Sequence, residues 1–413
     1  MLTTLHFNKS VEKLKANVSL PASKSITNRA LILKQLSNEN FLILNQSLAE
    51  DSVLLETILK NLTFTDKHYQ KNIFVNNAGT AMRFLTAFLS ITKGEWILSG
   101  SERMKERTVE SLVNALSQLG ADISYCEKKG FPPILIKGKK IKGGNLSIKA
   151  NTSSQFVTAL LLISGFLEKG LSLTLDGPIV SEPYIEMTLK ILKYFGIESS
   201  VLENTINIIN QNFQSKDLLI ESDWSAASYW YEIAAFSKNV DLKLIGLTNS
   251  GWQGDAIVAE IFKNFGVNSE FQKDGVRLTK TNTIVKEFSF DFKDYPDLAQ
   301  TVAVSCAGLG IKATLTGLES LTIKECNRLM ALETELNKIG CKAISKNENE
   351  LIIEPSIIKA KKIIHTYNDH RMAMSFAPLA IILEKLQLEN INVVKKSYPG
   401  FWNDLQKIGF SFE

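Results

Sequence analysis

The stretch from Asn77 to Arg83 joins residue types that can bind a small anion. Asn-Ala-Gly-Thr predicts a tight loop that ends in a helix N-cap, and the residues from Ala81 to Phe88 favour a helix. The first turn of such a helix has unpaired N–H groups, and Gly79 lets an anion approach the backbone closely. Arg83 adds a guanidinium about one turn further along. For this stretch alone, the alternative is an ordinary capped helix with a solvated arginine.

The same design recurs along the chain. Polar turns that each precede an apolar segment occur at residues 23–29, 77–83, 151–155, 223–228, 295–299 and 368–372. A second marker is a glycine after Leu, Phe or Ile, expected to cap a helix in the left-handed conformation, at Gly120, Gly196, Gly266, Gly340 and Gly409. Both markers recur at about 70 residues, a period that predicts a repeat protein of about six copies, the first of them short.

Each copy is expected to contain a helix after its turn, strands, a second helix that ends at the glycine, and further strands. Alternating side chains at Leu146–Ile148 and Leu171–Leu175 are typical of strands. A chain of 413 residues is longer than a single core usually supports. We therefore expect a mixed α/β protein with two similar domains of three copies each, divided just before Asp223.

The repeat also predicts where the charged residues gather. If the copies pack with approximate symmetry, their helix N-termini can point toward one cleft. The polar turns would then supply Lys24, Arg29, Arg83, Gln155, Asp297, His370 and Arg371. Such a cleft would bind small, multiply charged anions.

Composition excludes several other classes of protein. The net charge of +4 is too small to indicate nucleic-acid binding. The four cysteines include no CxxC pair and the four histidines are scattered, so we expect no zinc site and reduced thiols. The N-terminal residues lack the apolar core of a signal peptide, and the longest apolar run, residues 156–167, is too short to span a bilayer. A soluble, cytoplasmic protein is expected.

Six stretches carry a likeness to a known family. They are Ser19–Ala30, Asn77–Arg83, Arg103–Arg107, Ser153–Gln155, Lys324–Arg328 and Asn368–Met374. In their order and spacing they resemble the 3-phosphoshikimate 1-carboxyvinyltransferase (EPSP synthase) family over nearly the whole chain. The resemblance implies two domains of three βαβαββ repeats each, an inverse α/β barrel-like fold, with residues 1–20 and 222–413 in one domain and 21–221 in the other.

The resemblance also implies a reaction and its binding residues. The family transfers the enolpyruvyl group of phosphoenolpyruvate to the 5-hydroxyl of shikimate 3-phosphate, without metal or organic cofactor, between domains that close over both substrates. Phosphoenolpyruvate would be held by Lys24, Asn77, Gly79, Arg107, Gln155, Arg328, Arg371 and Lys396. Shikimate 3-phosphate would be held by Lys24, Ser25, Arg29, Ser153, Ser154, Gln155, Ser181, Tyr184, Asp297 and Lys324. Substrates with this many phosphate and carboxylate groups require Arg and Lys.

Asp297 and Glu325 are the acid–base candidates. The reaction takes a proton from the 5-hydroxyl, gives one to the methylene carbon of phosphoenolpyruvate, and later removes one from that carbon. Two carboxylates in different environments can divide this work. The resemblance assigns Asp297 to the hydroxyl, Glu325 to the carbon, and Lys24 to the departing phosphate. Taken alone, Asp297 is more often a plain helix cap after Pro296, and Glu325, between Lys324 and Arg328, is a helix-surface ion pair.

Several positions depart from the family pattern. They are Ala22 for Gly, Phe84 for Pro, Ala226 for Ser, Ser320 for Asn, Cys326 for Thr or Ser, and Asn327 for Asp. None removes a proposed catalytic group, but substrate affinity depends on them. Gly79 borders the glyphosate pocket in this family, so the resemblance predicts competition between glyphosate and phosphoenolpyruvate.

Two rival functions remain open. UDP-N-acetylglucosamine enolpyruvyl transferase typically uses a loop cysteine near the position of Arg103 to Arg107, where this chain has none. A non-catalytic anion-binding paralogue would be expected to have lost Asp297, Glu325 or Lys24. The expected partners are therefore the two small-molecule substrates, with no nucleic acid and no membrane, and the expected state is a monomer.

Overall fold

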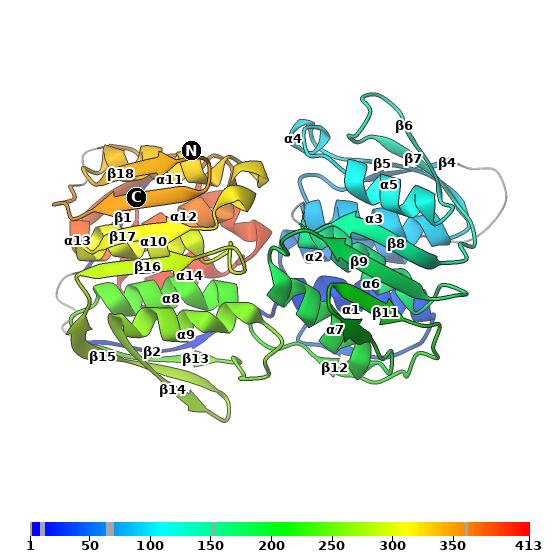
Figure 1. The fold of residues 1–413 in the computed structure, drawn as a ribbon. Coiled ribbons are helices and arrows are strands. Elements are labelled where there is room, and N and C mark those ends of the chain that lie inside the picture. The colour runs from blue at the N-terminus through cyan, green and yellow to red at the C-terminus, as the bar shows by residue number, and fades with distance from the viewer. Residues whose placement is uncertain (1, 9–12, 63–69, 151–152, 360–361) are drawn as a thin grey trace. The chain divides into compact units, whose positions relative to one another are not determined.

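The computed structural model of the chain describes residues 2–8, 13–62, 70–150, 153–359 and 362–413. Asn151 and Thr152, which belong to the third predicted polar turn, lie outside these residues. The chain forms two compact units (Figure 1). Unit 1 comprises Met1–Ser23, Leu48–Glu50 and Glu221–Glu413, and unit 2 comprises Lys24–Ser47 and Asp51–Ile220.

Unit 2, which runs from blue to green in Figure 1, alternates helices and strands. Its elements are α1 (Lys24–Ser37), β3 (Ile43–Leu44), α2 (Glu50–Asn61), β4 (Gln70–Phe74), α3 (Gly79–Ile91), β5 (Gly94–Ser99), α4 (Glu102–Lys105), α5 (Glu110–Gln118), β6 (Asp122–Tyr125), β7 (Ile134–Gly138), β8 (Gly144–Lys149), α6 (Ser154–Ser164), β9 (Leu171–Asp176), α7 (Glu182–Tyr194), β10 (Ser200–Leu202), β11 (Thr205–Ile208) and β12 (Leu218–Leu219).

Unit 1 begins with two N-terminal strands and continues after unit 2. Its elements are β1 (Leu2–Phe7), β2 (Leu14–Ser19), α8 (Trp224–Phe236), β13 (Val240–Ile245), η1 (Gly254–Ile257), α9 (Val258–Lys263), β14 (Phe265–Gln272), β15 (Gly275–Ile284), β16 (Glu287–Asp291), α10 (Ala299–Leu309), β17 (Lys312–Thr316), η2 (Glu319–Ile323), α11 (Arg328–Lys338), β18 (Lys342–Lys346), β19 (Glu350–Glu354), α12 (His370–Phe376), η3 (Ala377–Leu379), α13 (Ala380–Leu383), β20 (Lys385–Glu389), η4 (Ile391–Lys396), α14 (Phe401–Lys407) and β21 (Phe410–Phe412).

The sheets reveal the repeat directly. Each unit has two four-stranded sheets, ordered β4-β5-β7-β6 and β10-β11-β9-β8 in unit 2, and β14-β15-β13-β2 and β16-β17-β19-β18 in unit 1. In each of them one pair of strands is parallel and the other two pairings are antiparallel. The parallel pairs β4–β5, β8–β9 and β16–β17 are joined by α3, α6 and α10, as a crossover requires. The expected repeated α/β fold is confirmed.

A helix follows each of the six predicted turns, namely α1, α3, α6, α8, α10 and α12. Helices α3, α6, α8 and α10 are buried on nearly all sides, because their sequences are apolar all round. The five predicted capping glycines have positive φ angles between 77° and 105°, which confirms the left-handed conformation expected for them. Among the described residues, no helix is long and apolar enough to cross a membrane.

Candidate active site

Unit 1 gathers six charged side chains that come from the starts and ends of its helices. We call Asp297, Glu325, Arg328, Asp369, Arg371 and Lys396 the unit 1 cluster. Asp297 precedes α10, Glu325 and Arg328 lie at the start of α11, Asp369 and Arg371 lie at the start of α12, and Lys396 ends η4. Polar turns before helices thus place five of these side chains, and the end of η4 places the sixth, Lys396.

Arg328 is the centre of this cluster and is only 2% exposed. Its Nε lies 2.7 Å from Asp369 Oδ2, its Nη2 lies 2.9 Å from Glu325 Oε2, and its Nη1 lies 3.3 Å from Asp297 Oδ1. Burial alone would lower the pKa of Arg328, but the three carboxylates together raise it. A buried guanidinium with three carboxylates is therefore permanently charged and fixed in orientation.

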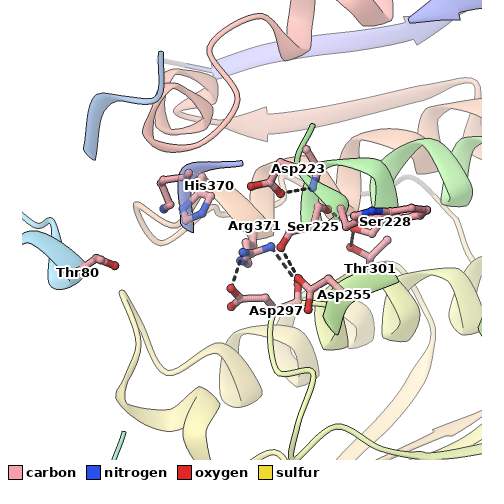
Figure 2. Close-up of polar contacts among 12 residues, drawn as sticks. Thr80, Asp223, Ser225, Ser228, Asp255, Asp297, Thr301, His370 and Arg371 are labelled. Carbon is pink, nitrogen blue, oxygen red and sulfur yellow. Dashed lines mark hydrogen bonds and ion pairs between the residues drawn. The ribbon is translucent and has the colours of Figure 1, made fainter. Parts of the chain in front are cut away.

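Arg371 makes the second guanidinium contact with Asp297, as Figure 2 shows. Its Nη2 lies 2.7 Å from Asp297 Oδ2, and its Nη1 donates to the backbone oxygen of Asp297 at 3.0 Å. Burial would raise the pKa of Asp297, but Arg371, Lys324 and Arg328 outweigh it and lower that pKa. Asp297 is therefore ionised and held in place from two sides. The alternative role as a helix cap is wrong, since Leu298 occupies the cap position of α10.

Glu325 bridges Arg328 to the last basic residue of the cluster. Its Oε1 accepts a hydrogen bond from Lys396 Nζ at 2.9 Å, and its side chain is 11% exposed. The ion pair with Arg328 expected in the alternative interpretation is present, but it is not on the surface, because Glu325 is largely buried between two cations. Lys324 contributes its charge to the neighbourhood of Asp297.

Two further polar groups adjoin the cluster. Asp255, from η1, is 4% exposed and accepts a hydrogen bond from Ser225 Oγ (Figure 2). Burial, together with the nearby charge of Asp297, raises the pKa of Asp255 to about 7. Tyr229 Oη lies 3.4 Å from Arg371 Nη1, and burial raises the pKa of this phenol. The surroundings of Asp297 thus hold two groups that favour their neutral forms.

Unit 2 contains a cradle around Gly79, the first residue of α3. A Cβ atom added at Gly79 would meet Arg107 Nη1 and Nη2 at 2.8 and 2.9 Å and Arg83 Nη1 at 2.9 Å. Arg83 Nη1 donates to the backbone oxygen of Gly79 at 3.1 Å, and Nη2 donates to that of Thr108 at 3.3 Å. Arg107 is buried, and its Nε and Nη1 have no hydrogen-bond partner among the described residues. A buried guanidinium with spare donors at a helix N-terminus is a fitting anion site.

Other predicted residues of unit 2 stand at helix starts. Lys24, at the start of α1, forms an ion pair with Asp51 of α2 at 3.1 Å. Ser153 caps α6 by accepting from the backbone N–H of Gln155, whose Nε2 donates to Thr80 Oγ1 of α3 at 3.3 Å. Gln155 thus links the N-termini of α3 and α6.

Arg29 lies in the interior of unit 2, where it is 4% exposed. Its guanidinium donates to the backbone oxygens of Ser25 and Tyr184, both at 2.9 Å, and to the hydroxyls of Thr158 and Thr188. Burial among these uncharged groups lowers the pKa of Arg29 to about 10. Arg29 therefore holds two other predicted residues in position.

Ser181 precedes α7 with a φ of 55°, a left-handed conformation that a serine adopts only where the surrounding structure imposes it. It is buried and its side chain makes no capping hydrogen bond to α7. An imposed conformation of this kind is frequent at binding sites.

The structure describes the surroundings of four of the six departures from the family pattern. Phe84 is buried beneath Arg29, whose Cζ lies 5.7 Å from the ring centroid. Asn327 caps α11 by accepting from Met330 N, as an aspartate would. Cys326 Sγ lies 3.7 Å from Asp369 Oδ2. Ser320 Oγ is buried without a hydrogen-bond partner among the described residues.

Three acidic residues were missed as members of the site, namely Asp51, Asp255 and Asp369. Asp369 belongs to the stretch Asn368–Met374 that resembles the family. Its position directly before a predicted helix could have indicated an N-cap whose carboxylate also pairs with an arginine. Asp51 and Asp255 had no such signal, since their partners lie 27 and 30 residues away along the chain.

Comparison with known proteins places these features in one family. The family model EPSP synthase (3-phosphoshikimate 1-carboxyvinyltransferase) matches residues 9–405. The 3-phosphoshikimate 1-carboxyvinyltransferase of Bacteroides fragilis (strain YCH46) is 45% identical over 404 residues, 97% of each chain, and that of Vibrio campbellii is 32% identical over 96% of this chain and 98% of its own. The solved EPSP synthase of Acinetobacter baumannii has the same fold, with a TM-score of 0.80 at 20% identity over the whole of both chains. The chain belongs to the EPSP synthase (3-phosphoshikimate 1-carboxyvinyltransferase) family.

Proposed function

We propose that the chain transfers the enolpyruvyl group of phosphoenolpyruvate to the 5-hydroxyl of shikimate 3-phosphate, releasing phosphate. The observation that carries this proposal is that Asp297 and Glu325 share the guanidinium of Arg328. Two carboxylates held by one cation supply a proton acceptor and a proton donor with different surroundings. Family membership supports the same reaction.

In the proposed reaction, the 5-hydroxyl oxygen bonds to C2 of phosphoenolpyruvate while C3 gains a proton. The C2–O bond to phosphate then breaks, C3 loses a proton, and phosphate leaves with the electron pair. Asp297 accepts the hydroxyl proton and Glu325 exchanges protons with C3. An anion that draws Arg371 away from Asp297 would weaken the ion pair that lowers the pKa of Asp297, and so would make Asp297 a stronger base.

The binding roles are divided between the units. In unit 2 the cradle of Gly79 and Arg107, with Lys24, Asn77 and Gln155, is proposed to bind phosphoenolpyruvate, and Arg328, Arg371 and Lys396 of unit 1 complete that set. Ser25, Arg29, Ser153, Ser154, Gln155, Ser181 and Tyr184 are proposed to bind shikimate 3-phosphate together with Asp297 and Lys324. The spare donors of Arg107 support the first assignment.

We propose residues 1–20 with 222–413, and residues 21–221, as the two functional domains, and the two compact units support this division. The proposed state is a cytoplasmic monomer, a location supported by four cysteines that are all free thiols. Sedimentation of the purified protein would test the monomer.

The decisive experiment measures phosphate release with both substrates together and with each alone. Release only with both, and its loss in Asp297→Asn and Glu325→Gln, would support the reaction and its acid–base pair. Release with UDP-N-acetylglucosamine in place of shikimate 3-phosphate would instead indicate the related enolpyruvyl transferase. Binding of either substrate without release would indicate a non-catalytic anion-binding protein.

A further inference from the structure

The helices of unit 1 enclose a seam of hydroxyl groups. Ser228 of α8 contacts Thr301 of α10 at 3.1 Å between hydroxyl oxygens, and Thr301 contacts Ser375 of α12 at 3.3 Å. Figure 2 shows Ser228 and Thr301 together, and all three residues are completely buried. The seam is polar but uncharged.

One helical turn beyond this contact, α8 carries Glu232 and α10 carries Ser305, each four residues after its seam hydroxyl. Because Ser228 faces Thr301, Glu232 and Ser305 follow on the same sides of the two helices. Cys306 follows Ser305 on α10, and its thiol pKa is raised first by burial and then by Cys341 and by Glu232, so Glu232 acts electrostatically on this part of α10.

Glu232 is 0% exposed, and neither of its carboxyl oxygens has a hydrogen-bond partner among the described residues. Ser305 is equally buried, and its hydroxyl also lacks a partner within that part of the chain. Burying polar groups without hydrogen bonds destabilises the folded state. Polar groups left over in this way commonly bind internal water, which makes about three hydrogen bonds to them.

A second buried glutamate provides the contrast. Glu335 of α11 is also 0% exposed, but Lys338 Nζ lies 2.7 and 3.0 Å from its two oxygens, and Tyr367 Oη donates to it as well. Within the part of the chain that the structure describes, no cation pairs with Glu232. Lys280 of β15 reaches α8, but its ammonium donates to the backbone oxygens of Ala234 and Ala235.

Burial therefore decides the state of Glu232. It raises the pKa of this carboxyl well above its ordinary value, and burial is the cause of the shift. An isolated carboxylate in such surroundings takes up a proton.

We propose that Glu232 and Ser305 line an internal hydration site between α8 and α10, where Glu232 is an uncharged carboxylic acid hydrogen-bonded to buried water. The site lies outside the residues proposed for enolpyruvyl transfer and does not depend on that function. Its ligand is water, bound by a carboxylic acid and a hydroxyl at the end of the Ser228–Thr301–Ser375 seam.

Infrared spectroscopy of the whole protein tests the protonation state. At neutral pH the difference spectrum of wild type minus Glu232→Gln is expected to contain the carbonyl band of a protonated carboxylic acid, because the contribution of Asp255, whose pKa is raised to about 7, is common to both proteins and cancels. The matched variant Glu335→Gln is expected to retain that band. Wild-type spectra over a range of pH suffice if a variant does not fold. A wild type without this band at neutral pH would overturn the proposal.

Two further measurements test the pH dependence of folding stability and the presence of bound water. The carboxyl of Glu232 has its ordinary pKa of 4.5 in the unfolded chain and a raised pKa in the folded protein. Between these two pKa values the folded protein holds a proton that the unfolded chain has lost. The folding equilibrium constant of the wild type, relative to that of Glu232→Gln, is therefore expected to fall tenfold for each pH unit of increase. A constant ratio would contradict a neutral Glu232.

A high-resolution crystal structure is expected to place water within hydrogen-bond distance of Glu232 and Ser305, and Ser305→Ala is expected to shift the carbonyl band. A dry space or a bound cation there would refute the hydration site.

Discussion

Gly79→Ala tests whether the cradle in unit 2 is a phosphoenolpyruvate site. Gly79 has no positive φ and begins α3, so an alanine fits its backbone conformation. Alanine is also the better helix former, by roughly 0.5–1 kcal/mol in a helix interior. The variant is therefore expected to fold, with an unfolding temperature equal to or slightly above that of the wild type.

The added methyl group acts on the guanidinium groups. Its Cβ would lie 2.8 and 2.9 Å from the Arg107 nitrogens and 2.9 Å from Arg83 Nη1. Non-bonded atoms pack at about 3.5 Å, so these nitrogens must retreat by roughly 0.6 Å. A retreat of this size removes about one charge-assisted hydrogen bond to a bound anion, which is about 1.5–3 kcal/mol. The expected loss in kcat/KM for phosphoenolpyruvate is about 10- to 150-fold.

The assay is steady-state phosphate release, with phosphoenolpyruvate varied at saturating shikimate 3-phosphate. The effect is expected in KM for phosphoenolpyruvate, with a smaller effect on KM for shikimate 3-phosphate. Gly400→Ala is the matched control, because Gly400 has a φ of −85° and a Cβ there would lie 3.6 Å from its nearest neighbour, Asp404 Oδ2. A Gly79→Ala enzyme that folds and keeps the wild-type KM for phosphoenolpyruvate would refute the assignment.

Three further predictions concern the unit 1 cluster, the adjoining residue Asp255 and the inhibitor. Asp297→Asn removes the carboxylate held by Arg371 and Arg328, and kcat for phosphate release is expected to fall about 10²- to 10⁴-fold; a fall below tenfold would exclude Asp297 as the base. Burial raises the pKa of Asp255 from 3.8 to about 7, so the folded protein holds a proton on Asp255 that the unfolded chain loses in this range. In denaturant titrations, the stability of the wild type relative to Asp255→Asn should therefore decline from pH 3.8 to about 7 and then level off. A stability difference that does not change with pH would contradict the raised pKa of Asp255. Glyphosate is expected to compete with phosphoenolpyruvate in the release assay, and an inhibition constant insensitive to phosphoenolpyruvate would contradict this.

Polar turns before apolar segments and glycines after helices predicted the repeat well, because the start and the end of a helix each require particular residues at that place in the chain. The helix expected from Ala81 to Phe88 extends from Gly79 to Ile91, since the apolar run continues and the loop glycine is already helical. The capping glycines were predictable because only glycine adopts the left-handed conformation at little cost.

The partners of the charged residues were harder to predict, because pairing depends on tertiary packing. Asp297 follows a proline before a helix and looks like a cap, but its carboxylate contacts Arg371, which is 74 residues away. Arg29 looks like a surface base in its turn, yet it is buried and bound to Thr158 and Thr188, which lie more than 100 residues further along. No local pattern contains this information.

The unit 1 cluster and the unit 2 cradle differ in how they tolerate mutation during evolution. Arg328 is both a proposed substrate ligand and the partner of three carboxylates, so its loss would leave buried negative charges and would be selected against through folding as well as activity. Arg107 has buried donors that no described residue uses, so its replacement is penalised mainly through ligand binding. Under selection by an inhibitor, viable variants should therefore arise around Gly79 and Arg107, while Arg328 and its carboxylates stay unchanged.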